Sequence, residues 1–406
     1  FGSSHFGLSF RGCSAPSWLP GSVLILSCTP LTMQSIALAL ACIACVSQAR
    51  RVLHSTGEKT LEAVSSHALA ELSSESEEKG NFKVVVCGGA GGIGQPLAML
   101  MTMNPNVAEV VVYDLTISAI PAAGVAADLS HLDKKAAVTS SVKSLEEKAI
   151  DVLGDAFAGA SLVLVPAGLP RKPGQTRDDL FKVNAGIAKE VVEAAAKYCP
   201  EAILGLIVNP VNSIVPAMAE LYKKKGLDPL KIVGVTSLDG VRANKFVAEI
   251  AGVDPADVAV PVIGGHAGVT IMPVFSQDKY AKTIPADQIP ALDKHVQNAG
   301  TDVVEAKNGK GSATLSMAYA GARLGSAVLA GLSGTPTTEC AYVKSSVVAG
   351  LPYFTSKVTF GKKGVEKIHK IGTLNAYEKE RFEEAKAALS KEIKSGLDYA
   401  ANNTLA

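Results

Sequence analysis

The sequence has few aromatic residues and almost no net charge. Of its 406 residues, 5% are aromatic, and the single tryptophan, Trp18, lies near the N-terminus. Single-stranded nucleic acids bind largely by stacking on aromatic rings, so a site of that kind is not expected. The formal net charge of +1 likewise excludes a broad basic surface for nucleic acid. The chain is instead 48% hydrophobic, enough for a large core and, by its length, about two or three domains.

Cysteines are few, and their spacing indicates no disulfide framework. Four of the seven fall within the first 45 residues, and the rest of the chain has only Cys87, Cys199 and Cys340. None of these three forms a CxxC pair, so we expect neither disulfides nor a metal site there. Cys42 and Cys45 are spaced as CxxC but lie inside an apolar run, where we interpret the spacing as accidental.

Acidic residues are absent from the first part of the chain. Residues 1–57 contain no Asp or Glu, are rich in Ser and carry three arginines, which is typical of an organellar targeting extension. The sequence begins with Phe1, and Met33 is an alternative start. From Met33, the apolar run 36–46 followed by 47–49 also has the form of a secretory signal, too short to span a membrane, as in a two-part plastid leader. We expect a mitochondrial matrix protein, with a plastid address as the alternative and no membrane attachment of the mature form.

The remainder divides by its hydrophobic pattern. Residues 58–81 are acidic and polar and are expected to form a solvated linker. From Phe82 to residue 235, expected strands at 83–88, 109–114, 162–166, 202–208 and 231–235 alternate with expected helices at 92–103, 177–197 and 213–225. Continuous apolar strands separated by helices predict a doubly wound parallel sheet covered on both faces.

After residue 235 the pattern changes. Helices are expected at 238–251, 290–298, 311–332 and 376–397. Between them lie a strand ending at Gly264 and antiparallel-looking strands near 270–275 and 353–360. We therefore predict an α/β chain with one domain at 82–235 and a second, α+β domain at 236–406.

A glycine-rich turn follows the first strand. In GGAGGIG, Gly88, Gly91 and Gly94 have GxxGxxG spacing, and Ile93 precedes the last glycine. One glycine permits the tight turn, one lets the backbone approach a pyrophosphate, and one lets the helix pack on the strand. The phosphates then lie at the helix N-terminus, where free N–H groups attract an anion. Such a turn alone also occurs as an ordinary βα connection, but its place between a strand and a helix is typical of a Rossmann domain.

An acidic residue completes this unit. Asp114 ends the next predicted strand, twenty residues after Gly94. A carboxylate there accepts hydrogen bonds from both ribose hydroxyls and repels a 2′-phosphate. The unit predicts NAD rather than NADP as the cofactor, bound by Gly88, Gly91, Ile93, Gly94 and Asp114.

A histidine and a carboxylate suggest acid/base chemistry. His266 lies between glycines in VIGGHAG, which leaves its imidazole approachable. A histidine can take a proton from an alcohol, although a lone histidine is more often structural. Asp239 and Arg242 share a helix face, and alone they are typical of a surface ion pair. Beside His266, the aspartate would orient the imidazole and the arginine would bind a carboxylate.

Two arginines occur in one loop, GLPRKPGQTR. Arg171 and Arg177 lie six residues apart among prolines and glycines, after the apolar run 161–166. Each guanidinium can bind a carboxylate with two parallel hydrogen bonds. The loop is interpreted either as a solvated basic turn or as a lid over a small dianion. Asn209 ends a predicted strand before Pro210, where it is placed to contact cofactor or substrate, or serves only as a turn residue.

Together these motifs resemble those of the malate dehydrogenases of bacteria, mitochondria and glyoxysomes. The resemblance extends from Phe82 to about Leu397 and rests on GGAGGIG, PAGLPRKPGQTRDDLF, VNPVNS, TSLDGVRANKF and GGHAGVT. It implies an oxidoreductase of the tricarboxylic acid cycle that transfers a hydride reversibly between L-malate and NAD, giving oxaloacetate and NADH. It also implies a homodimer, and it makes the second domain the catalytic one.

The resemblance implies a role for each charged site residue. Arg171 would bind the distal substrate carboxylate, and Arg242 the proximal one. Arg177 would polarise the reacting oxygen. His266 would be the acid/base, with Asp239 as its partner.

It also implies three neutral contacts. Asn184 and Asn209 would contact cofactor and substrate. Met317 would line the nicotinamide end, and its other interpretation is a core methionine.

Three alternatives have their own signatures. Tyr353 and Lys357 match a Tyr-x-x-x-Lys catalytic pair, but on the expected strand they stand about 13 Å apart rather than adjacent. A lactate-type enzyme should carry a neutral residue in place of Arg171. A nucleotide-binding protein without activity should have lost the histidine or an arginine, and all are present.

Overall fold

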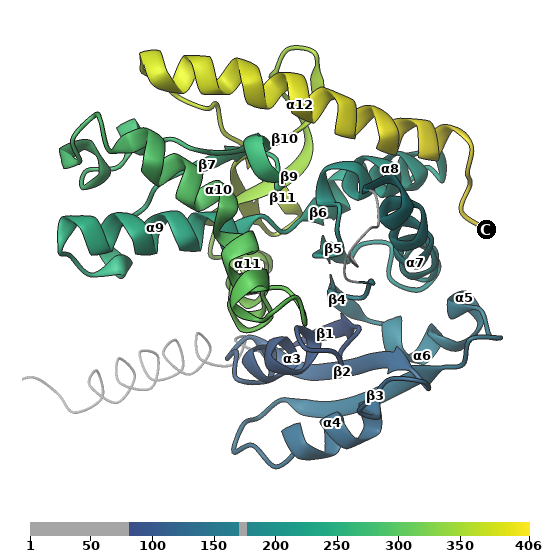
Figure 1. Ribbon diagram of the computed structural model, residues 1–406. Coiled ribbons are helices and arrows are strands. Elements are labelled where there is room, and N and C mark those ends of the chain that lie inside the picture. The colour runs from purple at the N-terminus through teal and green to yellow at the C-terminus, as the bar shows by residue number, and fades with distance from the viewer. Residues whose placement is uncertain (1–80, 170–176) are drawn as a thin grey trace, which may run out of the picture. The chain divides into compact units, whose positions relative to one another are not determined.

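The computed structural model describes residues 81–169 and 177–406, except for the side chains of residues 177–179 (Figure 1). The predicted targeting extension at 1–57, residues 58–80 of the predicted linker, and Arg171 lie outside the described residues.

One sheet organises the described chain. Its strands lie in the order β3-β2-β1-β4-β5-β6-β9-β10-β7-β8, with β11 paired to β10. The strands are β1 (Phe82–Cys87), β2 (Val107–Leu115), β3 (Ala137–Lys143), β4 (Ala160–Val165), β5 (Ile203–Leu206), β6 (Ile232–Gly234), β7 (Val262–Gly264), β8 (Ile271–Pro273), β9 (Thr337–Val348), β10 (Leu351–Gly361) and β11 (Gly364–Ile368).

Helices connect these strands. They are α3 (Gly94–Thr102), α4 (Ala122–Leu129), α5 (Ala149–Val152), α6 (Gly154–Phe157), α7 (Arg177–Tyr198), α8 (Val211–Lys224), α9 (Ser237–Ala251), α10 (Ile289–Ala306), α11 (Leu315–Leu332) and α12 (Ala376–Ala401).

The first six strands are parallel and have the order of a Rossmann sheet, 3-2-1-4-5-6. Along β1, Val84 and Val86 pack in one core cluster, whereas Val85 and Cys87 pack in the other. Successive side chains of a strand point to opposite faces, so both faces of the sheet are buried. The predicted doubly wound parallel sheet is therefore confirmed.

The sheet continues past residue 235. Strand β9 pairs antiparallel with β6 through Tyr342 and Gly234, and it forms a hairpin with β10. Helix α11, which precedes β9 in the chain, packs against α3 and β4, where Met317 and Leu324 join the core cluster of Val84. The second half is thus α+β, as predicted, but it extends the same sheet and contributes a helix to the core of the first half.

Helix α11 is the one helix among the described residues whose length and hydropathy would suit a membrane span. Because 56% of that segment is buried inside the protein, its apolar character fits its place in the core.

The strand predicted near residues 353–360 is confirmed as part of β10. Tyr353 is fully buried there, and its hydroxyl donates to Glu220 Oε1 at 2.8 Å. Lys357 lies opposite Cys340 on β9. The helix that a Tyr-x-x-x-Lys catalytic pair requires is not formed.

Helix α12 extends from α8 past β10 (Figure 1), and it packs on both of these elements and on the turn after β7. Its buried Arg381 donates to Asp293 Oδ2 of α10 at 2.7 Å and to the Val269 carbonyl at 3.1 Å. Asp293 also accepts from the Tyr377 hydroxyl at 2.7 Å and from Gln297 Nε2 at 2.9 Å. This network fixes α10 and the segment around Val269 to α12.

We expect Asp293→Ala to lower the free energy of unfolding by about 3 kcal/mol, because it leaves the buried Arg381 guanidinium without its main partner. Glu384 still contacts that guanidinium, which keeps the loss at the lower end of the range for a broken buried pair. Urea unfolding measures it. The control is Asp398→Ala, which removes an exposed 2.6 Å pair with Lys394 and should cost less than about 1 kcal/mol. Equal losses of stability in the two variants would contradict the structural role of the Asp293–Arg381 pair.

Candidate active site

A cavity of about 1240 Å³ lies at the carboxyl ends of the parallel strands, where ligands of open α/β sheets bind. Segments far apart in the sequence line it. From the nucleotide motif these are Gly88, Gly91, Ile93, Gly94 and Asp114, and from the remaining motifs Asn184, Asn209, Asp239, Arg242 and His266. The structure thus brings most of the sequence-predicted site residues to one place.

The glycine turn requires glycine at two positions. Gly88 has φ +87°, and a Cβ there would lie 2.8 Å from the Ala167 backbone. A Cβ on Gly94, the first residue of α3, would lie 2.0 Å from the Gly88 carbonyl oxygen. Ile93 occupies the N-cap of α3, and no side chain caps that helix. The turn therefore presents bare backbone and an uncapped helix N-terminus to the cavity, which suits a pyrophosphate.

Asp114 both closes this turn and faces the cavity. Its Oδ2 accepts from the Ala90 N–H at 2.9 Å, and its Oδ1 accepts from the Ser118 hydroxyl at 2.6 Å and the Leu115 N–H at 2.8 Å. A carboxylate has about four acceptor sites. The three bonds above leave about one acceptor site of Asp114 for a ribose hydroxyl. The glycine turn and Asp114 together therefore fit NAD.

Two residues that the sequence motifs do not indicate line the same end. Lys143, at the end of β3, is only 5% exposed, and its Nζ lies 3.4 Å from Glu190 Oε2. No motif marks either residue. Their proximity arises from the packing of β3 near α7, so only the tertiary structure reveals it.

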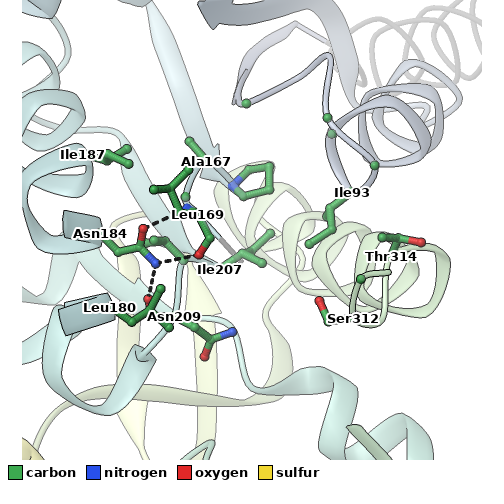
Figure 2. A pocket seen from close by; sticks show the side chains of 18 of the residues that line it. Ile93, Ala167, Leu169, Leu180, Asn184, Ile187, Ile207, Asn209, Ser312 and Thr314 are labelled. Carbon is green, nitrogen blue, oxygen red and sulfur yellow. Dashed lines mark hydrogen bonds between the residues drawn. The ribbon is translucent and has the colours of Figure 1, made fainter. Parts of the chain in front are cut away.

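Asn184 is committed to backbone groups (Figure 2). It is 1% exposed, its Oδ1 accepts from the Leu169 N–H at 2.8 Å, and its Nδ2 donates to the Leu169 and Asn209 carbonyls at 3.2 and 2.7 Å. It thereby links Leu169, which precedes Arg171 and Arg177 in the chain, to Asn209 in the turn after β5. That turn contains a cis Asn209–Pro210 bond, and the Asn209 side chain is exposed at the cavity.

His266 and Asp239 form a short contact. His266 Nδ1 lies 2.6 Å from Asp239 Oδ2, at the start of α9. Asp239 is fully buried, and its Oδ1 has no hydrogen-bond partner among the described residues. Because an ionised carboxylate can only accept, we assign the proton to Nδ1. Nε2 is then the imidazole nitrogen left for a ligand in the cavity.

Arg242 lies one turn after Asp239 on α9 and also lines the cavity. Burial lowers the pKa of Arg242, and the negative charges of Asp239 and Asp302 partly offset this effect. A partly desolvated guanidinium favours an anionic ligand such as a carboxylate.

Two other predicted residues have different surroundings. Arg177 begins α7, and its side chain is not among those described. Met317 is 5% exposed and packs in the core cluster of α3 and α11. The cavity wall just before α11 is formed instead by Ser312 and Thr314 (Figure 2).

The chain matches known families over both halves. Residues 82–234 match the lactate/malate dehydrogenase NAD binding domain, and residues 236–400 match the lactate/malate dehydrogenase alpha/beta C-terminal domain. The first match agrees with the fit of the turn and Asp114 to a dinucleotide, and it confirms NAD as the cofactor.

Curated relatives give the same result. The chain is 52% identical to the glyoxysomal malate dehydrogenase of Citrullus lanatus, covering 78% of this chain and 87% of that protein. It is 50% identical to the mitochondrial malate dehydrogenase of the same organism, covering 87% and 99%. It is 52% identical to the mitochondrial malate dehydrogenase of Chlamydomonas reinhardtii, covering 78% and 82%.

Solved structures share the fold. The malate dehydrogenase of Cryptosporidium parvum superposes with a TM-score of 0.67 at 26% identity, covering 78% of this chain and 99% of that one. The lactate dehydrogenase of Eimeria maxima with NADH and oxamate has the same TM-score, 0.67, at 24% identity, covering 80% and 98%, and shows the fold alone. With the family matches and the relatives above, these likenesses confirm the resemblance seen in the motifs: the chain belongs to the lactate/malate dehydrogenase family.

Proposed function

We propose that the chain is an NAD-dependent L-malate dehydrogenase in which His266 is the acid/base and Asp239 is its partner. The observation that carries this proposal is the 2.6 Å contact between His266 Nδ1 and the buried Asp239 carboxylate, in the cavity that also contains the nucleotide turn. The curated relatives, named as malate dehydrogenases, support malate as the substrate.

In malate oxidation, the neutral imidazole accepts the proton of the substrate hydroxyl at Nε2. The adjacent negative charge of Asp239 stabilises the imidazolium that forms. When bound, NAD supplies the acceptor for the hydride that leaves the same carbon. In oxaloacetate reduction, the protonated His266 donates to the carbonyl oxygen.

The substrate is a four-carbon dicarboxylate in this proposal. Arg242 binds the proximal carboxylate, and its position in the cavity supports this role. Arg171 binds the distal carboxylate and selects malate over lactate, whereas Arg177 polarises the reacting oxygen. Both of these roles rest on the sequence motif alone.

Three neutral residues complete the proposed contacts. Asn209 is exposed at the cavity and contacts the substrate hydroxyl or the cofactor. Asn184 contacts the cofactor while its amide is held by backbone groups. Met317 approaches the nicotinamide from the core, behind the cavity wall.

We further propose an organellar homodimer that works in the tricarboxylic acid cycle. Relatives of this chain are mitochondrial, glyoxysomal and peroxisomal. The acid-poor segment 1–57 favours the mitochondrial matrix, with a plastid as the alternative. The proposed domains are residues 82–235 for NAD and 236–406 for catalysis.

His266→Asn tests the catalytic role. We expect kcat for oxaloacetate reduction to fall by at least about 10²-fold, because general acid/base groups contribute that much or more. NADH affinity, measured by fluorescence titration, should persist, since the nucleotide turn is untouched. The control is His295→Asn, at an exposed histidine stacked on Phe246 of α9. If the His266 variant kept its turnover, the assignment would be refuted.

Asp114→Ser tests cofactor choice. Removing a charge close to the ribose 2′ position should reduce the preference for NADH over NADPH by about fivefold or more, since at ~4 Å the Coulomb energy is about 1–4 kcal/mol and about 1.4 kcal/mol is tenfold. The ratio of kcat/KM with the two cofactors measures it. The control is Glu109→Ser, which removes the same charge near the opposite end of β2. An unchanged ratio in the Asp114 variant would exclude the carboxylate as the selector.

A further inference from the structure

The second asparagine of the VNPVNS motif has a different environment from the first. Asn212 lies in the first turn of α8 and is 1% exposed, three residues after Asn209. Asn209 lines the cavity, whereas Asn212 is not part of the cavity wall that the structure describes. A buried amide in the first turn of a helix needs hydrogen-bond partners, and those partners indicate what it does.

The partners of Asn212 belong to the turn that carries the histidine. Its Oδ1 accepts from the His266 N–H at 2.8 Å, and its Nδ2 donates to Thr270 Oγ1 at 3.1 Å. Thr270 Oγ1 in turn contacts both backbone groups of Ala267, at 3.0 Å to the N–H and 2.8 Å to the carbonyl oxygen. One amide group therefore holds His266 directly and the next residue through one hydroxyl.

The packing of the Asn212 amide explains why residue 265 is a glycine. A Cβ on Gly265 would lie 2.6 Å from both Oδ1 and Nδ2 of Asn212, and 2.7 Å from Thr270 Oγ1. No side chain fits there, so Gly265 is needed for the amide to reach the turn. The Gly265 N–H also donates to the Thr270 carbonyl at 2.8 Å, which closes the turn.

A carboxylate on α12 anchors the other side of the amide. Asn212 Nδ2 donates to Glu392 Oε2 at 2.6 Å, a charge-assisted hydrogen bond. Helix α12 approaches α8 closely here, because a Cβ on Gly396, one turn after Glu392, would lie 2.2 Å from the Ser213 carbonyl oxygen. The amide thus links the histidine turn to two packed helices.

We propose that Asn212 is a positioning residue for His266. Its amide fixes the backbone of the turn so that Nδ1 meets Asp239 and Nε2 faces the substrate, an inference that rests on the proposed role of His266. The site requires an acceptor toward the His266 N–H and a donor toward Thr270 and Glu392. Asparagine supplies both, aspartate supplies only the acceptor, and leucine supplies neither.

The first test is Asn212→Leu in the full chain. We expect kcat to fall by about 10- to 100-fold, the scale of a small misplacement of a catalytic group, with NADH affinity unchanged. The spectroscopic readout is the proton resonance of the short His266 Nδ1–H hydrogen bond, assigned by its loss in His266→Gln. In Asn212→Leu this resonance should shift or broaden.

The matched control is Asn244→Leu on α9. Asn244 is 8% exposed, and its Oδ1 accepts from the Val260 N–H at 2.9 Å, so it also holds a backbone with a buried amide. Both variants should lower the melting temperature, but only Asn212→Leu should lower kcat and move the His266 resonance.

A second pair of variants tests the positioning role of Asn212 if Asn212→Leu does not fold. Asn212→Asp keeps the acceptor for His266 but sets a carboxylate against Glu392, and kcat should fall. Adding Glu392→Gln supplies an amide donor opposite that carboxylate, and part of kcat should return. A role in general stability alone predicts that the melting temperature falls and recovers in this way while kcat per folded enzyme stays at the wild-type value.

The outcomes separate the two proposals. If His266→Gln keeps its turnover, the proposed function fails, and the role of Asn212 fails with it. If His266→Gln is inactive while the folded Asn212 variants keep wild-type kcat and an unshifted resonance, only the role of Asn212 is overturned.

Discussion

The hydrogen bond between His266 and Asp239 is the interaction on which the site depends. It joins the turn after β7 to the start of α9, and it leaves Nε2 of the imidazole for a ligand. The turn is narrow, because Gly264 has φ +97° and a Cβ there would lie 2.2 Å from the Thr270 carbonyl oxygen. Arg381 holds the Val269 carbonyl from α12, and Asn212 holds the His266 N–H from α8. Groups on two helices therefore determine the backbone that presents one imidazole.

The sheet places this pair next to the nucleotide turn. Strand β6 ends just before α9, so Asp239 and Arg242 lie at the same edge of the sheet as the turn after β1. Strand β9 continues the sheet beyond β6, and α11 packs against α3, which begins in the glycine turn. The two halves of the chain share a core, and this shared core fixes the glycine turn and the His266–Asp239 pair at the same cavity. A separate, loosely linked second domain would not do so.

The sequence predicts the residues whose chemistry is local and misses those whose role is tertiary. Gly88 and Gly94 are recognisable because their backbone geometry excludes a Cβ, and the continuous apolar strands predict the parallel sheet. Strand β3 is not predicted, since Ala137–Lys143 is a mostly exposed edge strand with a polar middle. Asn184 is predicted as a cofactor contact, yet its hydrogen bonds go to the Leu169 and Asn209 backbone. Asn212 lies in the VNPVNS motif, but its role cannot be predicted from the sequence, because its side-chain partners lie 54 or more residues away.

The central claim is that arginines bind both ends of a four-carbon diacid while an imidazole meets its middle. A crystal structure of the complex with NADH and an unreactive analogue of oxaloacetate tests it most directly. The account predicts that the oxygen on the second carbon lies within hydrogen-bond distance of His266 Nε2, with one carboxylate on Arg242 and the other on Arg171. A diacid that binds away from His266, or with a carboxylate that contacts neither arginine, would contradict the account.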